Sequence, residues 1–175
     1  LEILNVLAKG ELPQTVLACQ LASVSPLNHD VTEYRFKLPA GKKVDYYPGQ
    51  YLEIVLDSNT GQEKAYPFSI ANTLTNERII QLHIRNVPDS RSMAQLNAAL
   101  VEKEVLNLRL PFGECTLEHV LPETYQSSGV PLVFLAGSTG FAPIKAMLET
   151  LLETEPTLPI YLYWGGRTEA DLYQH

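Results

Sequence analysis

Apolar and polar residues recur with a period of about two along residues 14–110, and this pattern predicts β-strands. The segment DVTEYRFKL (30–38) shows it clearly, with apolar side chains at Val31, Tyr34, Phe36 and Leu38. Tyr34, Phe36 and Leu38 are two residues apart and so lie on one face of a strand, which predicts burial of that face.

Five further segments have the same character, and turn-forming residues separate them. The segments are TVLACQLASV (15–24), YLEIVL (51–56), YPFSIA (66–71), IIQLHI (79–84) and VLNLRL (105–110). The turn signals are Pro26, Gly41, Pro48-Gly49, Gly61 and Asn76. Six short strands at this spacing predict an all-β antiparallel six-stranded Greek-key barrel, with a helix over residues 92–100 before the last strand.

The pattern changes near residue 130. An apolar run, VPLVFLA (130–136), leads into a small-residue turn and a helix-like segment, IKAMLETLLE (144–153), and a second apolar strand and the start of a helix follow. This order predicts the first part of an α/β parallel-sheet nucleotide-binding domain over residues 130–175. The barrel then occupies residues 13–118, and the polar segment 119–129 connects the two domains.

Two parallel strands are too few for a sheet that is covered on both faces. We therefore expect the nucleotide-binding domain to be incomplete and the chain to be a fragment of a longer protein. The alternative is a half-domain that leans on the barrel or on a partner. Residues 1–12 are predicted to be a linker or N-terminal extension, or a short helix.

The turn after the apolar run consists of Gly137, Ser138, Thr139 and Gly140. Small side chains let backbone N–H groups approach an anion, and the N-terminus of the next helix adds unpaired donors and a favourable dipole. The turn lacks the G-x-G-x-x-G spacing of the dinucleotide fingerprint. It nevertheless favours a diphosphate ligand at this position.

Composition narrows the choice of partners. The net charge of −7 argues against nucleic acid and anionic membranes. Cys19 and Cys115 are too far apart in sequence to be closely spaced metal ligands, so no metal site is expected. No run of about 18 apolar residues could span a bilayer, and the first residues lack the order of a secretory signal. We expect a soluble, cytoplasmic protein.

Several motifs occur in a defined order: AYPFSIAN (65–72), LHIRNVPDSRSMAQL (82–96), LPFGE (110–114), LAGSTGFAP (135–143) and YWGGR (163–167). Together they resemble the ferredoxin-NADP reductase superfamily, and most closely its NAD(P)H:flavin oxidoreductases and the reductase modules of bacterial oxygenases. The resemblance implies a flavin-binding barrel with an Arg-x-aromatic-Ser motif. It also implies a following NAD(P)-binding domain that opens with Gly-Gly-Thr-Gly-x-x-Pro.

The resemblance implies that the segment Tyr66, Pro67, Phe68 and Ser69 lines the flavin. Ser69 takes the catalytic role, because the family serine hydrogen-bonds the flavin near N5, and Phe68 packs on the isoalloxazine ring. Without the resemblance, both are ordinary residues of a barrel strand.

Tyr66 departs from the family pattern, which has an arginine against the flavin phosphate at this position. A tyrosine cannot supply the charged, bidentate fork that suits a phosphate. Either Lys64, Arg85 or Arg91 takes over this role, or flavin is held weakly as a substrate, or flavin binding is lost.

The predicted helix offers a second phosphate contact at its N-terminus. The residues implied in cofactor binding there are Ser90, Arg91, Ser92 and Met93, whose backbone N–H groups suit a pyrophosphate. The alternative is that Ser92 is simply the N-cap of the helix.

Three other residues complete the implied flavin pocket. Tyr51 follows a Pro-Gly-Gln turn and walls the pocket, or else packs as an ordinary strand tyrosine. His83 approaches the ribityl chain or has a structural role. Gly113 forms a tight turn at the barrel rim that faces the nucleotide domain, or is only a turn glycine.

For the nicotinamide nucleotide, the resemblance places Gly137, Thr139 and Gly140 at the diphosphate, with Pro143 fixing the first turn of the helix. Arg167 lies at the end of the next parallel strand, where ligands gather in open α/β sheets. It faces the adenosine ribose or its 2′-phosphate, or is a surface arginine, so the choice between NADH and NADPH stays open.

The resulting hypothesis is an NAD(P)H-dependent flavin or ferredoxin reductase type of enzyme. Its expected cofactors are FAD, with FMN as the alternative, and NADH or NADPH. Electrons pass from the nicotinamide to the flavin and then to free flavin, to a ferredoxin-type iron-sulfur protein or to an oxygenase. The alternative is a non-catalytic flavin- or partner-binding module that has lost redox function, as the tyrosine at position 66 suggests.

Overall fold

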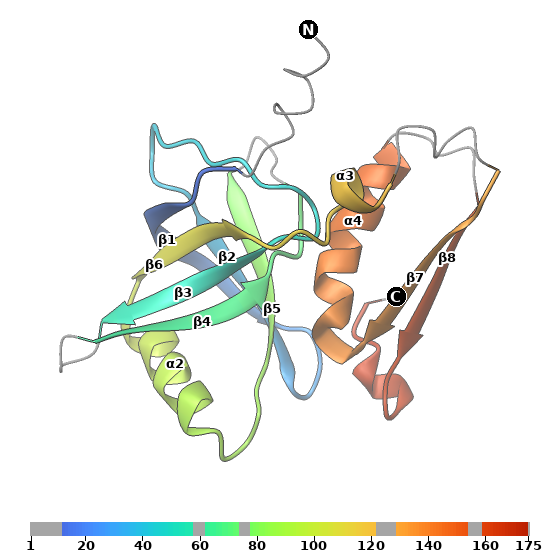
Figure 1. The fold of residues 1–175 in the computed structure, drawn as a ribbon. Helices are drawn as coiled ribbons and strands as arrows, with labels where there is room; N and C mark the ends of the chain where they lie inside the picture. The colour runs from blue at the N-terminus through green and yellow to red at the C-terminus, as the bar shows by residue number, and fades with distance from the viewer. Residues whose placement is uncertain (1–11, 58–61, 74–77, 122–128, 154–158, 175) are drawn as a thin grey trace, which may run out of the picture.

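The structure of the chain is a computed structural model that describes residues 12–57, 62–73, 78–121, 129–153 and 159–174. Most of the predicted linkers and the turn signals at Gly61 and Asn76 lie outside these residues. Figure 1 shows that the described chain consists of a β-barrel and a smaller α/β unit beside it.

Six antiparallel strands form the barrel, which confirms the fold that the alternating pattern predicts. They are β1 (Thr15–Pro26), β2 (Val31–Lys37), β3 (Tyr51–Asp57), β4 (Glu63–Ser69), β5 (Ile79–Arg85) and β6 (Val105–Phe112). Their hydrogen-bonded order is β4-β3-β6-β1-β2-β5, and an isolated bridge between Ile70 and Leu82 joins the two ends of the sheet. Neighbours in the sheet are thus often distant in sequence, as in a Greek key.

The inward-facing side chains of the strands form one continuous core. In β6, Leu106, Leu108 and Leu110 are buried at alternate positions, and Leu52 and Ile54 do the same in β3. The period of two therefore predicts the buried face correctly, because successive side chains of a strand point to opposite faces.

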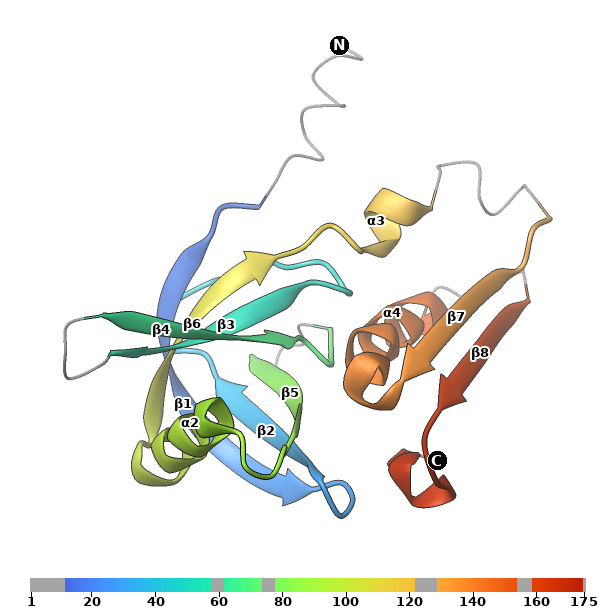
Figure 2. The same cartoon turned by 60° about the horizontal axis from the view of Figure 1, so that its bottom comes forward.

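One helix, α2 (Arg91–Glu102), covers an end of the barrel (Figure 2). Its inner face contributes Leu96, Ala99 and Leu100 to the barrel core. The hydroxyl of Ser90 caps the helix by accepting a hydrogen bond from the Met93 N–H at 3.3 Å. The helix was expected over residues 92–100, but the alternative that Ser92 is its N-cap is wrong, because Ser92 already lies inside the first turn.

The α/β unit follows a short helix, α3 (Leu117–Val120). It consists of β7 (Leu132–Gly137), a 3-10 turn η2 (Ser138–Gly140), α4 (Phe141–Glu153), β8 (Ile160–Gly165) and a 3-10 turn η3 (Glu169–Asp171). The strands are parallel, with Leu132 opposite Ile160 and Gly137 opposite Gly165. At the expected helix start after β8, the described chain forms only the η3 turn.

The two faces of the β7–β8 sheet differ. On one face, Phe134 is buried in a cluster with Met147 of α4. On the other, Val133 and Leu135 of β7 lie opposite Tyr161 and Tyr163 of β8, and all four side chains are 49–74% exposed.

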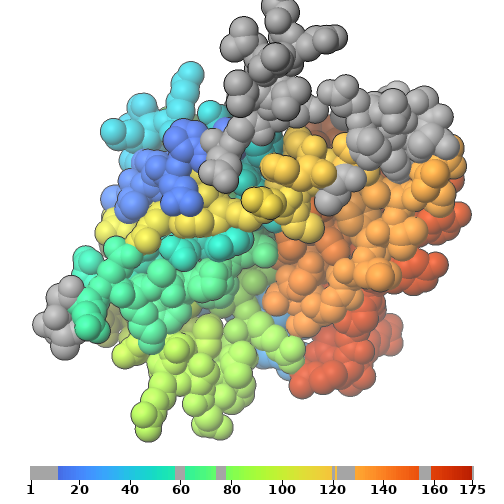
Figure 3. Space-filling model, viewed as in Figure 1, coloured from blue at the N-terminus to red at the C-terminus, as the bar shows by residue number. Residues whose placement is uncertain are grey.

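The α/β unit lies directly against the barrel (Figure 3). Val31 of β2 is buried in one cluster with Phe141 and Tyr173 of the α/β unit. Gly49 has a φ of +105°, and a Cβ at this position would overlap the Cys115 carbonyl oxygen and the Met147 side chain. A glycine is therefore required at this contact between the barrel and α4. In the part of the chain that the structure describes, no helix is long and apolar enough to cross a membrane.

Candidate functional site at the contact of the barrel and the α/β unit

The ends of β3, β4 and β6 meet at one rim of the barrel. Tyr51 pairs with Ser69 across β3 and β4, and its ring stacks on Phe112 with 5.3 Å between centroids and 18° between planes. Gly113 has a φ of +92°, and a Cβ there would lie 3.1 Å from the Tyr51 ring. The structure thus brings together three of the residues predicted to line the flavin: Tyr51, Ser69 and Gly113.

The segment of β4 that carries the flavin motif alternates between the core and the surface. Tyr66 is 6% exposed and belongs to the core cluster, Phe68 packs against the same cluster, and Pro67 is exposed. Ser69 is half-buried, and its hydroxyl has no hydrogen-bond partner among the described residues. It is therefore free to bond a ligand at the rim.

A cation does lie beside Tyr66, but it belongs to Lys64. The Lys64 Nζ lies 5.0 Å from the centre of the Tyr66 ring and donates to Gln95 Oε1 at 2.6 Å, and its distance to Ser92 Oγ is 3.4 Å. The Tyr66 hydroxyl donates to the same Gln95 oxygen at 3.2 Å. This group places a positive charge and hydroxyl groups next to the first turn of α2, where Ser90, Arg91, Ser92 and Met93 lie.

Arg85 occupies a different place from Lys64, on the side of the barrel that faces the α/β unit. Its Nε and Nη2 both lie 2.7 Å from Asp30 Oδ2, and its Nη1 donates to Ser138 Oγ at 3.2 Å. Of the three cations considered as replacements for the family arginine, Lys64 contacts Tyr66, whereas Arg85 contacts the loop predicted to hold the nucleotide diphosphate.

The loop between β7 and α4 has open space on its glycines. A Cβ at Gly137 or at Gly140 would meet no atom within 4 Å, and neither residue has a positive φ. Contacts within the described chain thus do not require glycine at either position, and an approaching ligand would find room there. Ser138 has a φ of +50°, and its carbonyl accepts from Trp164 Nε1 at 3.0 Å.

His83 is buried at the same contact. Its Nδ1 lies 3.2 Å from the Tyr173 hydroxyl. Its Nε2 has no hydrogen-bond partner among the described residues, and Glu33 Oε2 lies 3.8 Å away. Burial, and secondarily the charge of Lys145, lower the pKa of His83 from 6.5 to about 4. The imidazole is therefore neutral at pH 7 and packs between the barrel and the C-terminal segment.

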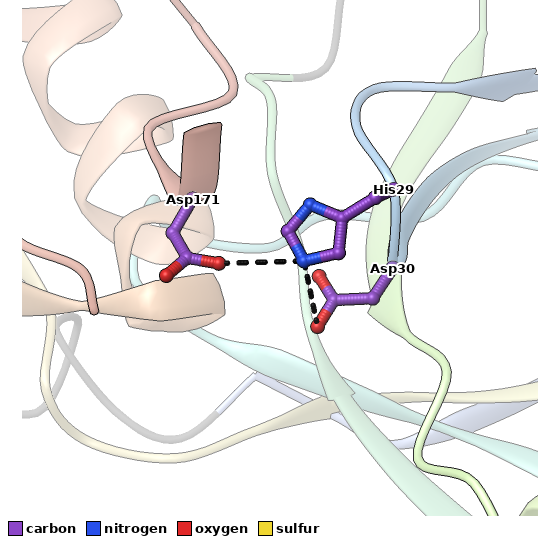
Figure 4. A group of neighbouring side chains, drawn as sticks. All are labelled: His29, Asp30 and Asp171. Atoms are coloured by element: carbon purple, nitrogen blue, oxygen red, sulfur yellow. Dashed lines mark ion pairs between the residues drawn. The ribbon is translucent and has the colours of Figure 1, made fainter. Parts of the chain in front are cut away.

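Arg167 joins a network of ion pairs between the two units. Figure 4 shows His29, Asp30 and Asp171, whose ligand atoms all lie within 4.8 Å of one another. Arg167 Nη2 lies 3.5 Å from a carboxylate oxygen of each aspartate. The pKa of Asp171 is lowered, mainly because its carboxylate accepts a hydrogen bond from the Thr168 N–H. Because Arg85 and Arg167 already neutralise these carboxylates, the group is a poor site for a metal cation and fits an interdomain contact.

The residues at the rim and at the loop fit the two expected cofactors. For a flavin phosphate, the structure offers Lys64 and the donors of the first turn of α2; for a nucleotide diphosphate, it offers the N-terminus of α4, the Ser138 hydroxyl and Arg85. Lys145 was not considered from the sequence, whereas Lys64 was named only as one of three possible replacements for the family arginine and Ser138 only as a member of the small-residue turn. Lys64 and Tyr66 are two residues apart on one strand and so share a face, which is a signal in the sequence that the lysine lies beside the tyrosine. The contacts of Ser138 and Lys145 depend on the tertiary structure.

Comparison with protein-family models agrees with this geometry. Residues 18–117 match the oxidoreductase FAD-binding domain, and residues 134–175 match the oxidoreductase NAD-binding domain. The first match spans more than half of the chain. The chain belongs to the oxidoreductase FAD-binding domain family. The predicted relationship to the ferredoxin-NADP reductase superfamily is confirmed, and FAD and a nicotinamide nucleotide are the cofactors that these domains bind.

Several curated relatives are reductase components of oxygenases. The chain is 38% identical over 144 residues to the terephthalate 1,2-dioxygenase reductase component 2 of Comamonas sp, covering 82% of this chain and 39% of the relative. It is 31% identical over 158 residues to protein RfbI of Salmonella typhimurium, covering 90% of this chain and 44% of the relative. The chain therefore spans less than half the length of these relatives.

A solved structure shows the same architecture. The cytochrome P450 reductase GcoB of Amycolatopsis superimposes with a TM-score of 0.74 at 26% identity, over 94% of this chain and 47% of that one.

Proposed function

We propose that the protein is a flavin-dependent oxidoreductase that takes hydride from NADH or NADPH onto bound FAD or FMN and passes electrons to an acceptor. The observation that carries this proposal is the contact between Arg85 of the barrel and Ser138 of the nucleotide loop, at 3.2 Å. It supports a single site built from both units. Bound flavin supplies the redox chemistry, and the protein aligns and shields the reacting groups.

On the barrel side, Lys64 takes the place of the family arginine and pairs with the flavin phosphate. Tyr66 and Gln95 hold the lysine above the first turn of α2, so the charge and the helix N–H groups act on the same anion. Ser69 directs its free hydroxyl to the flavin near N5, with Tyr51 and Phe68 beside it; the N5 contact rests on the family motif.

On the nucleotide side, the diphosphate lies over Gly137, Thr139 and Gly140. The open space on the two glycines and the adjacent N-terminus of α4 support this placement. Arg85 is held by Asp30 so that its remaining donors face the loop. Arg167 is partly engaged with Asp30 and Asp171, and its role at the ribose or 2′-phosphate stays a prediction.

The acceptor is free flavin, a ferredoxin-type protein or an oxygenase component. The relatives named for a dioxygenase and a cytochrome P450 system support an oxygenase-linked acceptor. The expected absence of nucleic-acid and membrane partners, the cytoplasmic localisation and the domain limits at residues 118 and 130 also stay predictions.

A second candidate function is a flavin- or partner-binding module without redox activity, which the tyrosine at position 66 favours. The two candidates separate in one experiment on the complete protein that carries this sequence. The protein is loaded with FAD under anaerobic conditions and mixed with NADH or NADPH, and the flavin absorbance is followed. Loss of the oxidised-flavin band within seconds supports the reductase. An unchanged band at saturating nucleotide supports the binding module.

A further inference from the structure

Lys145 of α4 reaches out of the α/β unit and contacts the barrel. Its Nζ donates to the carbonyl oxygen of Ala71 at 3.0 Å and to Glu149 Oε1 at 2.5 Å. The side chain is only 15% exposed, so this contact lies within the interface and not on the open surface.

The barrel segment that Lys145 contacts directly follows Ser69 and is held by backbone hydrogen bonds within the barrel. Ile70 and Ala71 are 1% and 0% exposed, the Ile70 N–H donates to the Gln50 carbonyl at 3.0 Å, and the Ala71 N–H donates to the Gln81 carbonyl at 2.8 Å. A displacement of the Ala71 carbonyl would therefore also displace Ser69, two residues earlier.

The next carbonyl of the same segment is held from within the barrel. The Tyr46 hydroxyl donates to the Asn72 carbonyl at 3.1 Å. The Asn72 side chain bonds the Thr73 and Ile79 carbonyls and the Gln81 N–H, each at 2.8 Å. Two adjacent carbonyls thus each accept one side-chain donor, and among the hydrogen bonds of the described residues the one from Lys145 links the segment to the other unit.

The backbone of Lys145 belongs to the helix that directly follows the nucleotide loop. It lies in the second turn of α4, and the η2 turn (Ser138–Gly140) leads directly into that helix. The Lys145 to Ala71 hydrogen bond is therefore a short connection between the proposed nucleotide loop and the proposed flavin serine. The ammonium also acts on His83, whose pKa its charge lowers in addition to burial.

We infer that Lys145 is a positioning residue for hydride transfer, which fixes α4 and its nucleotide loop relative to the Ser69 segment. The inference rests on the proposed function. Hydride transfer is sensitive to the distance between donor and acceptor, and a misplacement of about 1 Å can cost roughly a hundredfold in rate. Loss of this one link therefore reduces the rate of the transfer step more than it reduces binding of either cofactor.

The test compares two substitutions, each of which removes the side-chain hydrogen bond to one of the two adjacent carbonyls. Lys145→Met removes the link to Ala71 across the interface, and Tyr46→Phe removes the link to Asn72 within the barrel. Lys145→Arg keeps the charge and the donors. Each is made in the complete protein that carries this sequence, and stopped-flow flavin reduction is measured with NAD(P)H and with its 4-deuterated form.

We expect Lys145→Met to lower the limiting rate of flavin reduction about tenfold or more, with a changed kinetic isotope effect and flavin affinity within about twofold of wild type. Tyr46→Phe stays within about twofold, and Lys145→Arg recovers most of the rate. A Lys145→Met protein with an unchanged rate and isotope effect, or an equal loss in Tyr46→Phe, overturns the inference. A wild-type protein whose flavin is not reduced by nucleotide contradicts the proposed function itself, so the two failures are distinct.

Discussion

The barrel and the α/β unit bury their apolar residues in different ways. In the barrel, every strand has partners and the interior is filled by its own side chains, with Phe36, Leu52, Ile54 and Leu108 fully buried. In the α/β unit, two strands form the sheet, and the exposed side chains of its outer face include Leu135 at 74%.

Three aromatic residues of the α/β unit, Phe141, Trp164 and Tyr173, pack in one cluster with a residue of the barrel. Phe141 stacks on Trp164 with 4.0 Å between centroids, Tyr173 packs edge-on against both rings, and Val31 of β2 closes this cluster. The barrel thus has a core of its own, whereas the position of the nucleotide loop depends on the contact between the two units. Substitutions that disturb this contact, or the residues proposed to bind the cofactors on either side of it, therefore test the difference between the two units.

The largest effect is expected at Gly49, where the barrel packs against α4. Gly49→Ala introduces a Cβ at a φ of +105°, where it overlaps the Cys115 carbonyl and Met147. We expect a loss of about 2–4 kcal/mol in the free energy of unfolding. Gly41→Ala is the matched control, because Gly41 also has a positive φ, +73°, but has no atom within 4 Å of the added Cβ.

The control should cost only roughly 1 kcal/mol, the strain of the backbone conformation alone. Urea denaturation of both variants measures the difference. Equal losses in the two proteins would show that the contact at Gly49 does not contribute to stability.

Acidification should weaken the same contact through His83. Its folded-state pKa of about 4 lies below the usual 6.5, so the unfolded chain takes up a proton first as the pH falls. The stabilisation from the neutral imidazole is complete above pH 6.5 and is lost as the pH falls towards 4, by at most about 3 kcal/mol.

Denaturation midpoints measured between pH 7 and pH 4 check this expectation. His83→Gln should flatten the dependence in that window. A His83→Gln protein with the wild-type slope would assign the acid sensitivity to other groups.

On the barrel side of the contact, Ser69→Ala should slow flavin reduction by NAD(P)H more than it weakens flavin binding. One hydrogen bond to the reacting region contributes roughly 1–3 kcal/mol, or about tenfold to a hundredfold in rate. Stopped-flow reduction at matched flavin occupancy measures it. A wild-type rate would remove Ser69 from the mechanism.

The smallest effect is expected at Lys64, which is exposed. Lys64→Met should weaken binding of FAD and FMN about fivefold, equivalent to roughly 1 kcal/mol, and leave riboflavin binding unchanged because riboflavin has no phosphate. Lys103→Met is the control, since Lys103 lines the same cavity of about 370 Å³ but has no contact with Tyr66 among those described. An equal loss for riboflavin would mean that Lys64 acts on the fold and not on the phosphate.

The fold could be predicted from the sequence because local patterns determine it. Alternation predicted all six barrel strands, but not all of their ends: the fourth strand was predicted over residues 66–71, whereas β4 spans Glu63–Ser69. The site could be predicted only in part. The motif order predicts roles for Ser69 and the glycine loop, and these stay predictions, whereas the partners of Arg85 are 55 and 53 residues away in sequence, at Asp30 and Ser138. No local pattern determines such contacts, and the same holds for Lys145 and Ala71.

The central claim is that flavin binds at the barrel rim and nucleotide at the loop that faces it. Backbone amide hydrogen exchange, measured with FAD alone, with NAD(P)H alone and with both, tests it most directly. FAD should protect amides at Ser69 and in the first turn of α2, and nucleotide should protect residues 137–141. Saturating FAD that protects neither barrel segment, or nucleotide that leaves the loop unprotected, would contradict the account.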